Sequence, residues 1–266
     1  MTHEMQRKFL IEELLKEEAD YRDVQIPVDV VEQKKLLRSL MNVRPPRAIS
    51  EQFLKIQDAY LKEEQTAIVD EDELFPSPLD ERLYLWQGDI TTLKVDAIVN
   101  AANSGMCGCF HPLHSCVDNI IHSRSGIELR LYCAKLMQKQ GHEEPTGQAK
   151  ITPAFNLPSS YILHTVGPII YGRVRKEDEE LLASCYRSCL SLAAEHGLSS
   201  VAFCCISTGE FRFPNERAAK IAIRTVREFL QKETSIKKVI FNVFKDLDRE
   251  IYERLLGAGG ENPHRA

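Results

Sequence analysis

The chain has 266 residues, of which 43% are hydrophobic and 27% charged, so it can bury a full core and is neither a disulfide-stapled miniprotein nor largely disordered. Its net charge of -5 gives no field that would attract nucleic acid or anionic lipid, so we expect no nucleic-acid partner. Residues 1–20 mix acids and bases without an apolar stretch, and no run is long enough to span a membrane. We therefore expect a cytoplasmic protein with reduced cysteines and no membrane partner.

Residues 1–80 have the pattern of helices rather than strands. Apolar side chains recur there at three- and four-residue spacing, and the prolines Pro76 and Pro78 interrupt the pattern. The sequence therefore predicts a helical N-terminal extension over 1–80, packed on a second part over 81–266. The expected helices are 9–18, 28–43 and 50–65.

From residue 82 onward, short apolar runs alternate with longer helical ones. Runs such as VAFCCI and VIFNVF are apolar on both faces, which is typical of a mostly parallel sheet covered by helices on both sides. The predicted fold class is α/β, with a mixed, mostly parallel central sheet flanked by helices on both faces. The expected strands are 83–86, 95–101, 161–166, 201–206 and 239–244, and the expected helices between the later strands are 181–197 and 215–233.

Three loops after these strands offer binding groups, because ligands of α/β sheets bind outside the carboxyl ends of strands. The loop from Ser207 to Pro214 has small residues before a helix N-terminus, which suits a phosphate, although an ordinary turn has the same composition. The loop from Asn100 to Gly105 carries two asparagines that can orient sugar hydroxyls or form a left-handed turn. Asp89 can accept a hydrogen bond from an amine or cap a short helix.

The motif CGCFHPLHSC, which begins at Cys107, puts three thiols and two imidazoles into ten residues. Thiolates and imidazoles are zinc ligands, and three protein ligands with an open fourth position are typical of a catalytic zinc site. Cys109, His114 and Cys116 give a Cys-x4-His-x-Cys arrangement around a proline turn. Cys107 and His111 remain alternative ligands, and a sulfur-rich loop without metal remains the alternative to a site. The remaining cysteines are expected to be core residues: Cys133, Cys185, Cys189, Cys204 and Cys205.

Together these motifs resemble the macrodomain family, an α/β fold that binds ADP-ribose. They are GDIT (88–91), VDAIVNAAN (95–103), PTGQAKIT (145–152), YILHTVGP (161–168) and ISTGEFRFP (206–214). Where ordinary hydrolytic macrodomains carry a glycine-rich loop, this chain has GCFHPLHSCVDNIIH over 108–122. That segment resembles the zinc-dependent microbial macrodomains, which are protein-ADP-ribose hydrolases. The stretch RSLMNVRPP at 38–46 resembles the end of their helical N-terminal extension.

The resemblance implies one zinc ion per chain, bound by Cys109, His114 and Cys116, and ADP-ribose as ligand and product. Asp89 would accept a hydrogen bond from the adenine amine. Asn103 would meet the distal ribose, and Asp118 would orient or activate water, which makes these two the catalytic candidates. The implied ADP-ribose-binding residues are Asp89, Ile90, Asn103, Cys116, Val117, Asp118, Ser207, Thr208, Gly209, Glu210 and Phe211.

One departure from the family pattern borders the second phosphate loop. Arg212 stands where many macrodomains have glycine, so a bulkier and charged side chain could hinder closure of the loop or add a phosphate contact.

The resemblance also implies an activity: zinc-dependent removal of mono-ADP-ribose from protein side chains. The implied linkage is to aspartate, the implied substrate is an ADP-ribosylated protein such as a lipoyl-carrier protein, and the implied partner is a sirtuin-like ADP-ribosyltransferase. Two alternatives are a reader module that binds ADP-ribose without cleaving it and an O-acetyl-ADP-ribose deacetylase. A fourth protein ligand would favour a structural zinc and hence the reader. We expect a monomer.

Overall fold

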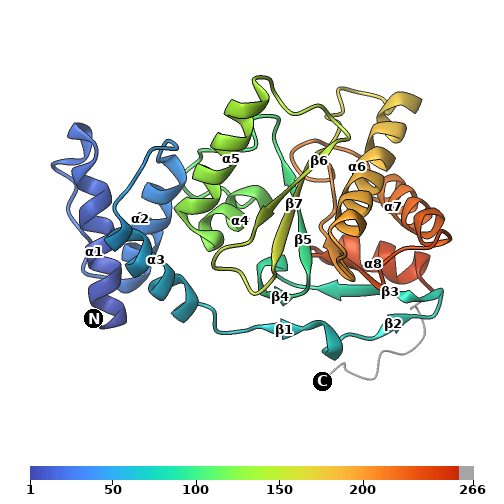
Figure 1. The fold of residues 1–266 in the computed structure, drawn as a ribbon, viewed down its shortest axis with the longest axis horizontal. Coiled ribbons are helices and arrows are strands. Elements are labelled where there is room, and N and C mark those ends of the chain that lie inside the picture. Colours follow the sequence, from blue (N-terminus) through green and yellow to red (C-terminus); the bar gives the residue numbers. More distant parts are fainter. Residues whose placement is uncertain (258–266) are drawn as a thin grey trace.

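The computed structural model describes residues 1–257, in which a seven-stranded sheet is combined with α-helices (Figure 1). Within this range, no helix combines the length and apolarity needed to cross a lipid bilayer. The helices are α1 (His3–Lys16), α2 (Val30–Val43), α3 (Glu51–Glu63), α4 (Val117–Ser125), α5 (Ile127–Gln140), α6 (Lys176–Glu195), α7 (Asn215–Leu230) and α8 (Asp246–Leu255). The strands are β1 (Val69–Asp70), β2 (Pro76–Ser77), β3 (Asp80–Gln87), β4 (Leu93–Lys94), β5 (Ala97–Ala102), β6 (Ala149–Pro153), β7 (Tyr161–Val166), β8 (Ser200–Phe203) and β9 (Lys238–Val243).

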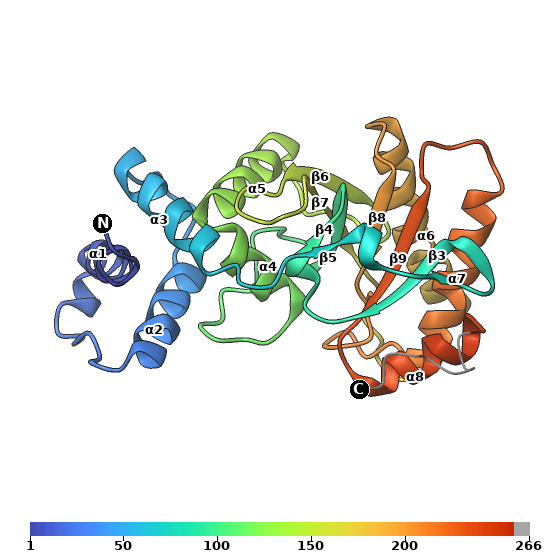
Figure 2. The same cartoon turned by 90° about the horizontal axis from the view of Figure 1, so that it is seen from below.

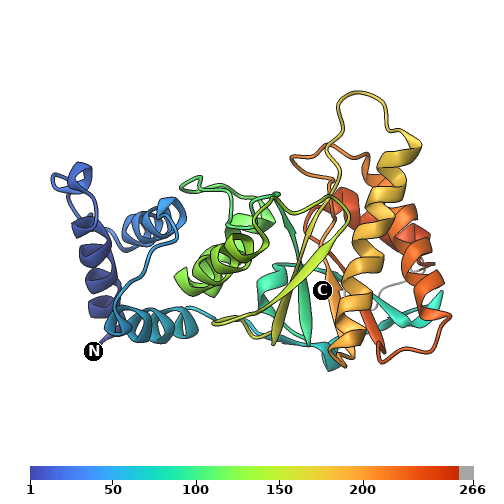
Figure 3. The same ribbon diagram turned by 45° about the horizontal axis from the view of Figure 1, so that its top comes forward.

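The main sheet has the strand order β2-β3-β9-β8-β5-β7-β6. Its five inner strands run parallel, and the two edge strands β2 and β6 run antiparallel to their neighbours. Helices α4 and α5 lie on one side of the sheet, and α6 and α7 lie on the other (Figure 3). The predicted fold class is thereby confirmed. Because the strands are covered on both faces, side chains such as Ile98, Leu163 and Val201 are fully buried.

The predicted strands are all present, but two of them are shorter than expected: β5 begins at Ala97 rather than at residue 95, and β8 ends early. The run VAFCCI stays in the sheet only to Phe203, and Cys204 to Ile206 already belong to the following loop. The sequence reading did not assign α4, α5, α8 or β6. Helix α4 begins at a cysteine cap and α5 at a glycine cap, so neither has the usual hydroxyl or carboxylate signal at its start.

The N-terminal helices α1, α2 and α3 form a group at one end of the molecule, next to α4 and α5 (Figures 1 and 2). They have a hydrophobic cluster of their own, in which Leu10, Ile11 and Phe53 are fully buried, and Ile127 of α5 joins that cluster. After α3 the chain pairs β1 with β4 and β2 with β3. The division of the chain at residue 80 stays a prediction.

Candidate functional site

The three predicted binding loops leave the sheet on the same side, at the carboxyl ends of its strands, because they follow parallel strands. They come after β3, β5 and β8. Two contacts join loops to one another. The backbone N–H of Ile170, after β7, donates to the carbonyl of Phe211 at 2.9 Å, and His114 Nε2 lies 3.5 Å from Glu210 Oε1. The β5, β7 and β8 loops are therefore one connected structure.

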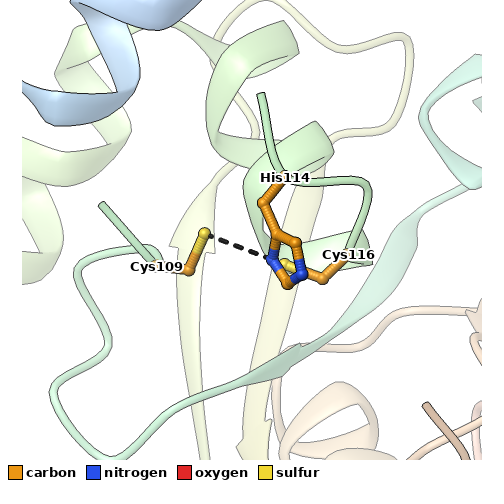
Figure 4. A group of neighbouring side chains, drawn as sticks. All are labelled: Cys109, His114 and Cys116. Atoms are coloured by element: carbon orange, nitrogen blue, oxygen red, sulfur yellow. Dashed lines mark hydrogen bonds between the residues drawn. The ribbon is translucent and has the colours of Figure 1, made fainter. Parts of the chain in front are cut away.

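The candidate metal group consists of Cys109, His114 and Cys116, which come together at the loop between β5 and α4 (Figure 4). Their ligand atoms all lie within 4.8 Å of one another, and Cys109 Sγ is 3.7 Å from His114 Nδ1. Tetrahedral zinc ligands at usual bond lengths are about 3.3–3.8 Å apart. The distance between Cys109 and His114 therefore lies in the range for zinc, and the mixed sulfur and nitrogen donors suit this ion. All three side chains are half-buried rather than sealed in the core.

Cys107 and His111, the alternative ligands, lie outside this group, which among residues 1–257 comprises three side chains. Cys107 packs against the hydrophobic core, and its carbonyl accepts a hydrogen bond from Arg130 Nε at 2.7 Å. His111 is exposed, with its ring centroid 5.7 Å from that of His114. The arrangement leaves room in the coordination sphere for a ligand from outside the group.

Gly108 allows the loop to turn between the two cysteines. Its φ is +82°, in the left-handed region that favours glycine. A Cβ atom at this position would lie 2.8 Å from Arg130 Nη2 and 3.2 Å from His122 Cγ. Backbone conformation and close packing thus both require glycine between Cys107 and Cys109.

Asp118 is the buried acid beside the metal group. It is 4% exposed, and Asn100 Nδ2 donates to its Oδ1 at 2.8 Å, while Asn103 Nδ2 lies 3.5 Å from its Oδ2. His122 Nε2 is 3.6 Å from Oδ1. Burial raises the pKa of Asp118 to about 6, although the hydrogen bond from Asn100 and the charge of Arg130 oppose this rise. A carboxylate with such a pKa can accept a proton near neutral pH.

A chain of buried polar side chains lies behind Asp118. Asn100 Nδ2 is 3.1 Å from His164 Nδ1, and His164 Nε2 is 2.9 Å from Thr152 Oγ1. Burial lowers the pKa of His164 to about 3 and also lowers that of His122, so both rings are neutral at physiological pH. His164 is thus a buried histidine with a polar neighbour at each ring nitrogen.

Asn103 and Asp89 already make bonds within their own loops. Asn103 Nδ2 donates to the carbonyl of Gly108 at 3.0 Å, and its Oδ1 accepts from the N–H of Gly105 at 3.0 Å. Asp89 Oδ1 accepts from the N–H and the hydroxyl of Thr91 at 3.0 and 2.7 Å, so Asp89 caps a short 3₁₀ helix. Both bonds from Thr91 end on Oδ1 of Asp89, which leaves Oδ2 of this carboxylate for another donor. The contact of Asp89 with adenine and that of Asn103 with ribose stay predictions.

The loop after β8 is held in a tight turn by its own backbone. The N–H of Phe213 donates to the carbonyl of Ser207 at 2.9 Å, and the N–H of Arg212 donates to that of Gly209 at 3.0 Å. Ser207 and Arg212 have φ values of +66° and +60°. The left-handed backbone at Arg212 explains why glycine suits this position, and the arginine side chain is exposed.

The remaining predicted binding residues lie in the same loops. Ile90 is buried in the 3₁₀ turn, and Val117 packs at the start of α4. Thr208 is half-buried and Glu210 exposed.

The sequence reading missed several residues that support the metal group. Asn119 Nδ2 donates to Cys109 Sγ at 3.1 Å, and its backbone N–H donates to Cys116 Sγ at 3.4 Å. Arg38 and Asn42 of α2 both donate to Asn119 Oδ1 at 2.8 Å. In the sequence, Arg38 and Asn42 belong to the stretch 38–46, and Asn119 belongs to the segment 108–122.

The sequence profile described as "Macro domain" matches residues 99–222. A Treponema medium protein named "Protein-ADP-ribose hydrolase" is 58% identical over 262 residues, covering 96% of this chain and 100% of that protein. A Fusarium oxysporum f. sp. cubense protein named "Probable bifunctional ADP-ribose hydrolase/ADP-ribosyltransferase" is 42% identical over 242 residues, covering 84% of this chain and 40% of that protein. The solved structure of a Trypanosoma brucei macrodomain in complex with ADP-ribose matches with a TM-score of 0.66 at 30% identity, covering 82% of this chain and 95% of that one.

Proposed function

The chain belongs to the macrodomain family, and on that premise we propose that it is a zinc-dependent protein-ADP-ribose hydrolase. The name of the Treponema relative supports the hydrolase activity, and the Trypanosoma macrodomain supports ADP-ribose as the ligand. The observation that carries the proposal is the placement of Cys109, His114 and Cys116 next to the buried acid Asp118. Thiol and imidazole ligands next to a carboxylate of raised pKa are what metal-assisted hydrolysis requires.

We assign the loops at the strand ends to the parts of ADP-ribose. Asp89, with Oδ1 engaged by Thr91, would use Oδ2 to accept a hydrogen bond from the adenine amine. The backbone N–H groups of residues 207–211, before the N-terminus of α7, would face the diphosphate, because helix N-termini and clustered amides attract anions. The distal ribose would then lie toward Asn103 and the metal group.

Hydrolysis breaks the bond between the anomeric carbon of ADP-ribose and a side chain of the modified protein. Asp118 would orient the attacking water and take its proton, a role that its pKa of about 6 suits because the carboxylate is ionised above that pH. Asn103, fixed by Gly108 and Asp118, would orient a ribose hydroxyl. Zinc held by Cys109, His114 and Cys116 would supply a Lewis acid that lowers the pKa of an oxygen ligand.

We extend the proposal to the substrate. The modified side chain would be an aspartate of a protein such as a lipoyl-carrier protein, and a sirtuin-like transferase would attach the ADP-ribose. The Fusarium relative supports the link to a transferase, because its name joins a hydrolase and an ADP-ribosyltransferase in one protein. We keep a cytoplasmic location as a prediction, in line with the eight free thiols.

The proposal is tested by measuring release of ADP-ribose from a mono-ADP-ribosylated protein. Wild type should release it, whereas Cys116→Ala and chelator-treated wild type should be slower by at least about 100-fold, given several kcal/mol of metal stabilisation. Equal rates in all three would contradict the role of zinc. Binding of ADP-ribose without release would indicate a reader, and turnover of O-acetyl-ADP-ribose without turnover of the modified protein would indicate the deacetylase.

A further inference from the structure

We propose that helix α2 of the N-terminal extension is a positioning element for the metal loop (residues 107–116), acting through Arg38, Asn42 and Asn119. The inference rests on the proposed zinc-dependent function. It assigns to these side chains, none of which is a metal ligand, the task of holding the ligand atoms at the spacing that zinc requires. It also gives the helical extension a function in the hydrolase site.

Asn119 is the residue through which the other two act. It is 1% exposed, its Nδ2 donates to Cys109 Sγ at 3.1 Å, and its backbone N–H donates to Cys116 Sγ at 3.4 Å. Its Nδ2 also donates to the carbonyl of His111 at 2.7 Å. N–H donors to sulfur stabilise thiolates and fix their direction. One residue on the first turn of α4 therefore holds both cysteine ligands.

Helix α2 fixes the orientation of the Asn119 amide. Arg38 Nη2 and Asn42 Nδ2 each donate to Asn119 Oδ1 at 2.8 Å. With its oxygen bound by two donors, the amide must direct its NH2 group toward the loop. Arg38 Nη2 also donates to the carbonyl of His114 at 2.6 Å, and Asn42 Nδ2 donates to that of Pro112 at 3.1 Å. The two α2 side chains thus bind the loop backbone at His114 itself and two residues before it.

A second connection joins the end of α2 to the beginning of the loop. Arg130 is 5% exposed, and its Nη1 donates to the carbonyls of Met41, Asn42 and Arg44 at 3.0, 2.7 and 2.7 Å. These include carbonyls at the C-terminus of α2, which have no partner within the helix. Nε of the same guanidinium donates to the carbonyl of Cys107 at 2.7 Å. Helix and loop therefore share one buried cation.

These bonds order the loop before a metal ion arrives. Without them, metal binding would have to order the loop at a cost in backbone conformational entropy. Preorganisation should therefore appear as tighter zinc binding. Because coupling between two sites is reciprocal, zinc should in turn tighten the docking of α2.

The test measures zinc affinity of the full chain by competition with a chromophoric chelator. Arg38→Ala and Asn42→Ala should each bind zinc about tenfold more weakly than wild type, the lower end of the effect usual for residues that orient metal ligands. The matched controls are Lys35→Ala and Ser39→Ala on the same helix. Lys35 pairs with Glu32 and Ser39 with the carbonyl of Lys35, away from the loop, so both controls should bind zinc as wild type does.

Two further measurements separate positioning from a general loss of structure. The zinc-free variants should bind ADP-ribose with the affinity of zinc-free wild type in calorimetry. Their cobalt(II) derivatives should show ligand-field absorption that differs from that of the wild-type derivative. Arg38→Lys keeps the charge but not the fork of donors, so it should lose less zinc affinity than Arg38→Ala. It replaces the alanine variant in the test if that variant does not fold. Wild-type zinc affinity in the Arg38 and Asn42 variants would overturn the inference. Absence of zinc binding by wild type itself would overturn both the proposed function and the inference.

Discussion

Seven of the eight cysteines occur in two contrasting regions of the structure, the core around α6 and β8 and the loop before α4. Burial raises the pKa of Cys185 to about 11 and that of Cys204 to about 12, and Cys185 Sγ donates to a backbone carbonyl at 3.4 Å. Burial raises the pKa of Cys116 in the loop to about 12 as well, so pKa alone does not distinguish the regions. The loop differs because Cys109 Sγ has an imidazole and an amide N–H as neighbours. Neighbouring groups, rather than the thiols themselves, define a metal site.

The largest expected effect comes from removing a thiol of the loop region, with removal of a core thiol as the comparison. Cys116→Ala should lose zinc and reduce ADP-ribose release on the order of 10³-fold, since it removes a ligand of a Lewis acid worth several kcal/mol. Cys189→Ala should keep zinc and activity while lowering the free energy of unfolding by about 1–2 kcal/mol, because the thiol is fully buried. Metal analysis, turnover and chemical denaturation check both variants. Retained zinc in Cys116→Ala would break the comparison.

A second variant tests whether Asp118, at the start of α4 beside the loop region, is the catalytic base. Asp118→Asn keeps an acceptor for Asn100 but removes the proton acceptor, so release of ADP-ribose should fall by about 10²-fold. Zinc content and ADP-ribose affinity should stay close to wild type. A rate within threefold of wild type would mean that another group activates the water.

A third variant lies outside both cysteine regions. Asp89→Ala should weaken ADP-ribose binding by at least about tenfold, because a hydrogen bond to a charged group contributes about 1.5–3 kcal/mol. Zinc affinity should not change, since Asp89 belongs to a different loop. Calorimetric titration with ADP-ribose measures the effect, and an unchanged affinity would remove Asp89 from the adenine site.

The last expected effect acts on stability rather than on function, and it concerns the buried polar chain behind Asp118. The pKa of His164 is lowered to about 3, so the folded ring stays neutral while the unfolded one takes up a proton below about pH 6.5. The free energy of unfolding should therefore fall between about pH 6.5 and pH 3, by up to ~1.4 kcal/mol per pH unit from this group. His164→Gln should flatten that dependence in denaturation curves, with exposed His142→Gln as the control. Parallel curves for wild type and His164→Gln would contradict the assignment.

The sequence predicts the sheet and the candidate metal ligands because both leave local signals. Apolar runs predict the inner strands, and the loop ligands Cys109, His114 and Cys116 are separated by at most seven positions. Helix α4 was missed because its cap is Cys116, whose sulfur accepts the N–H of Asn119 in place of a hydroxyl or carboxylate oxygen. Cysteine is not among the usual cap residues.

The supporting contacts could not be predicted because they join residues far apart in the chain. Arg38 and Asn119 are separated by 81 positions, and Asn100 and His164 by 64. Only the folded chain brings α2 onto the loop and β5 beside β7. A motif can therefore locate the ligands, but not the groups that orient them.

The most direct test of the central claim is a zinc titration of metal-stripped protein with ADP-ribose release as the signal. Release from a mono-ADP-ribosylated protein should be minimal without metal, rise in proportion to added zinc and reach a plateau at one equivalent per chain. A rate that is already maximal in the stripped protein and does not respond to zinc would contradict the account.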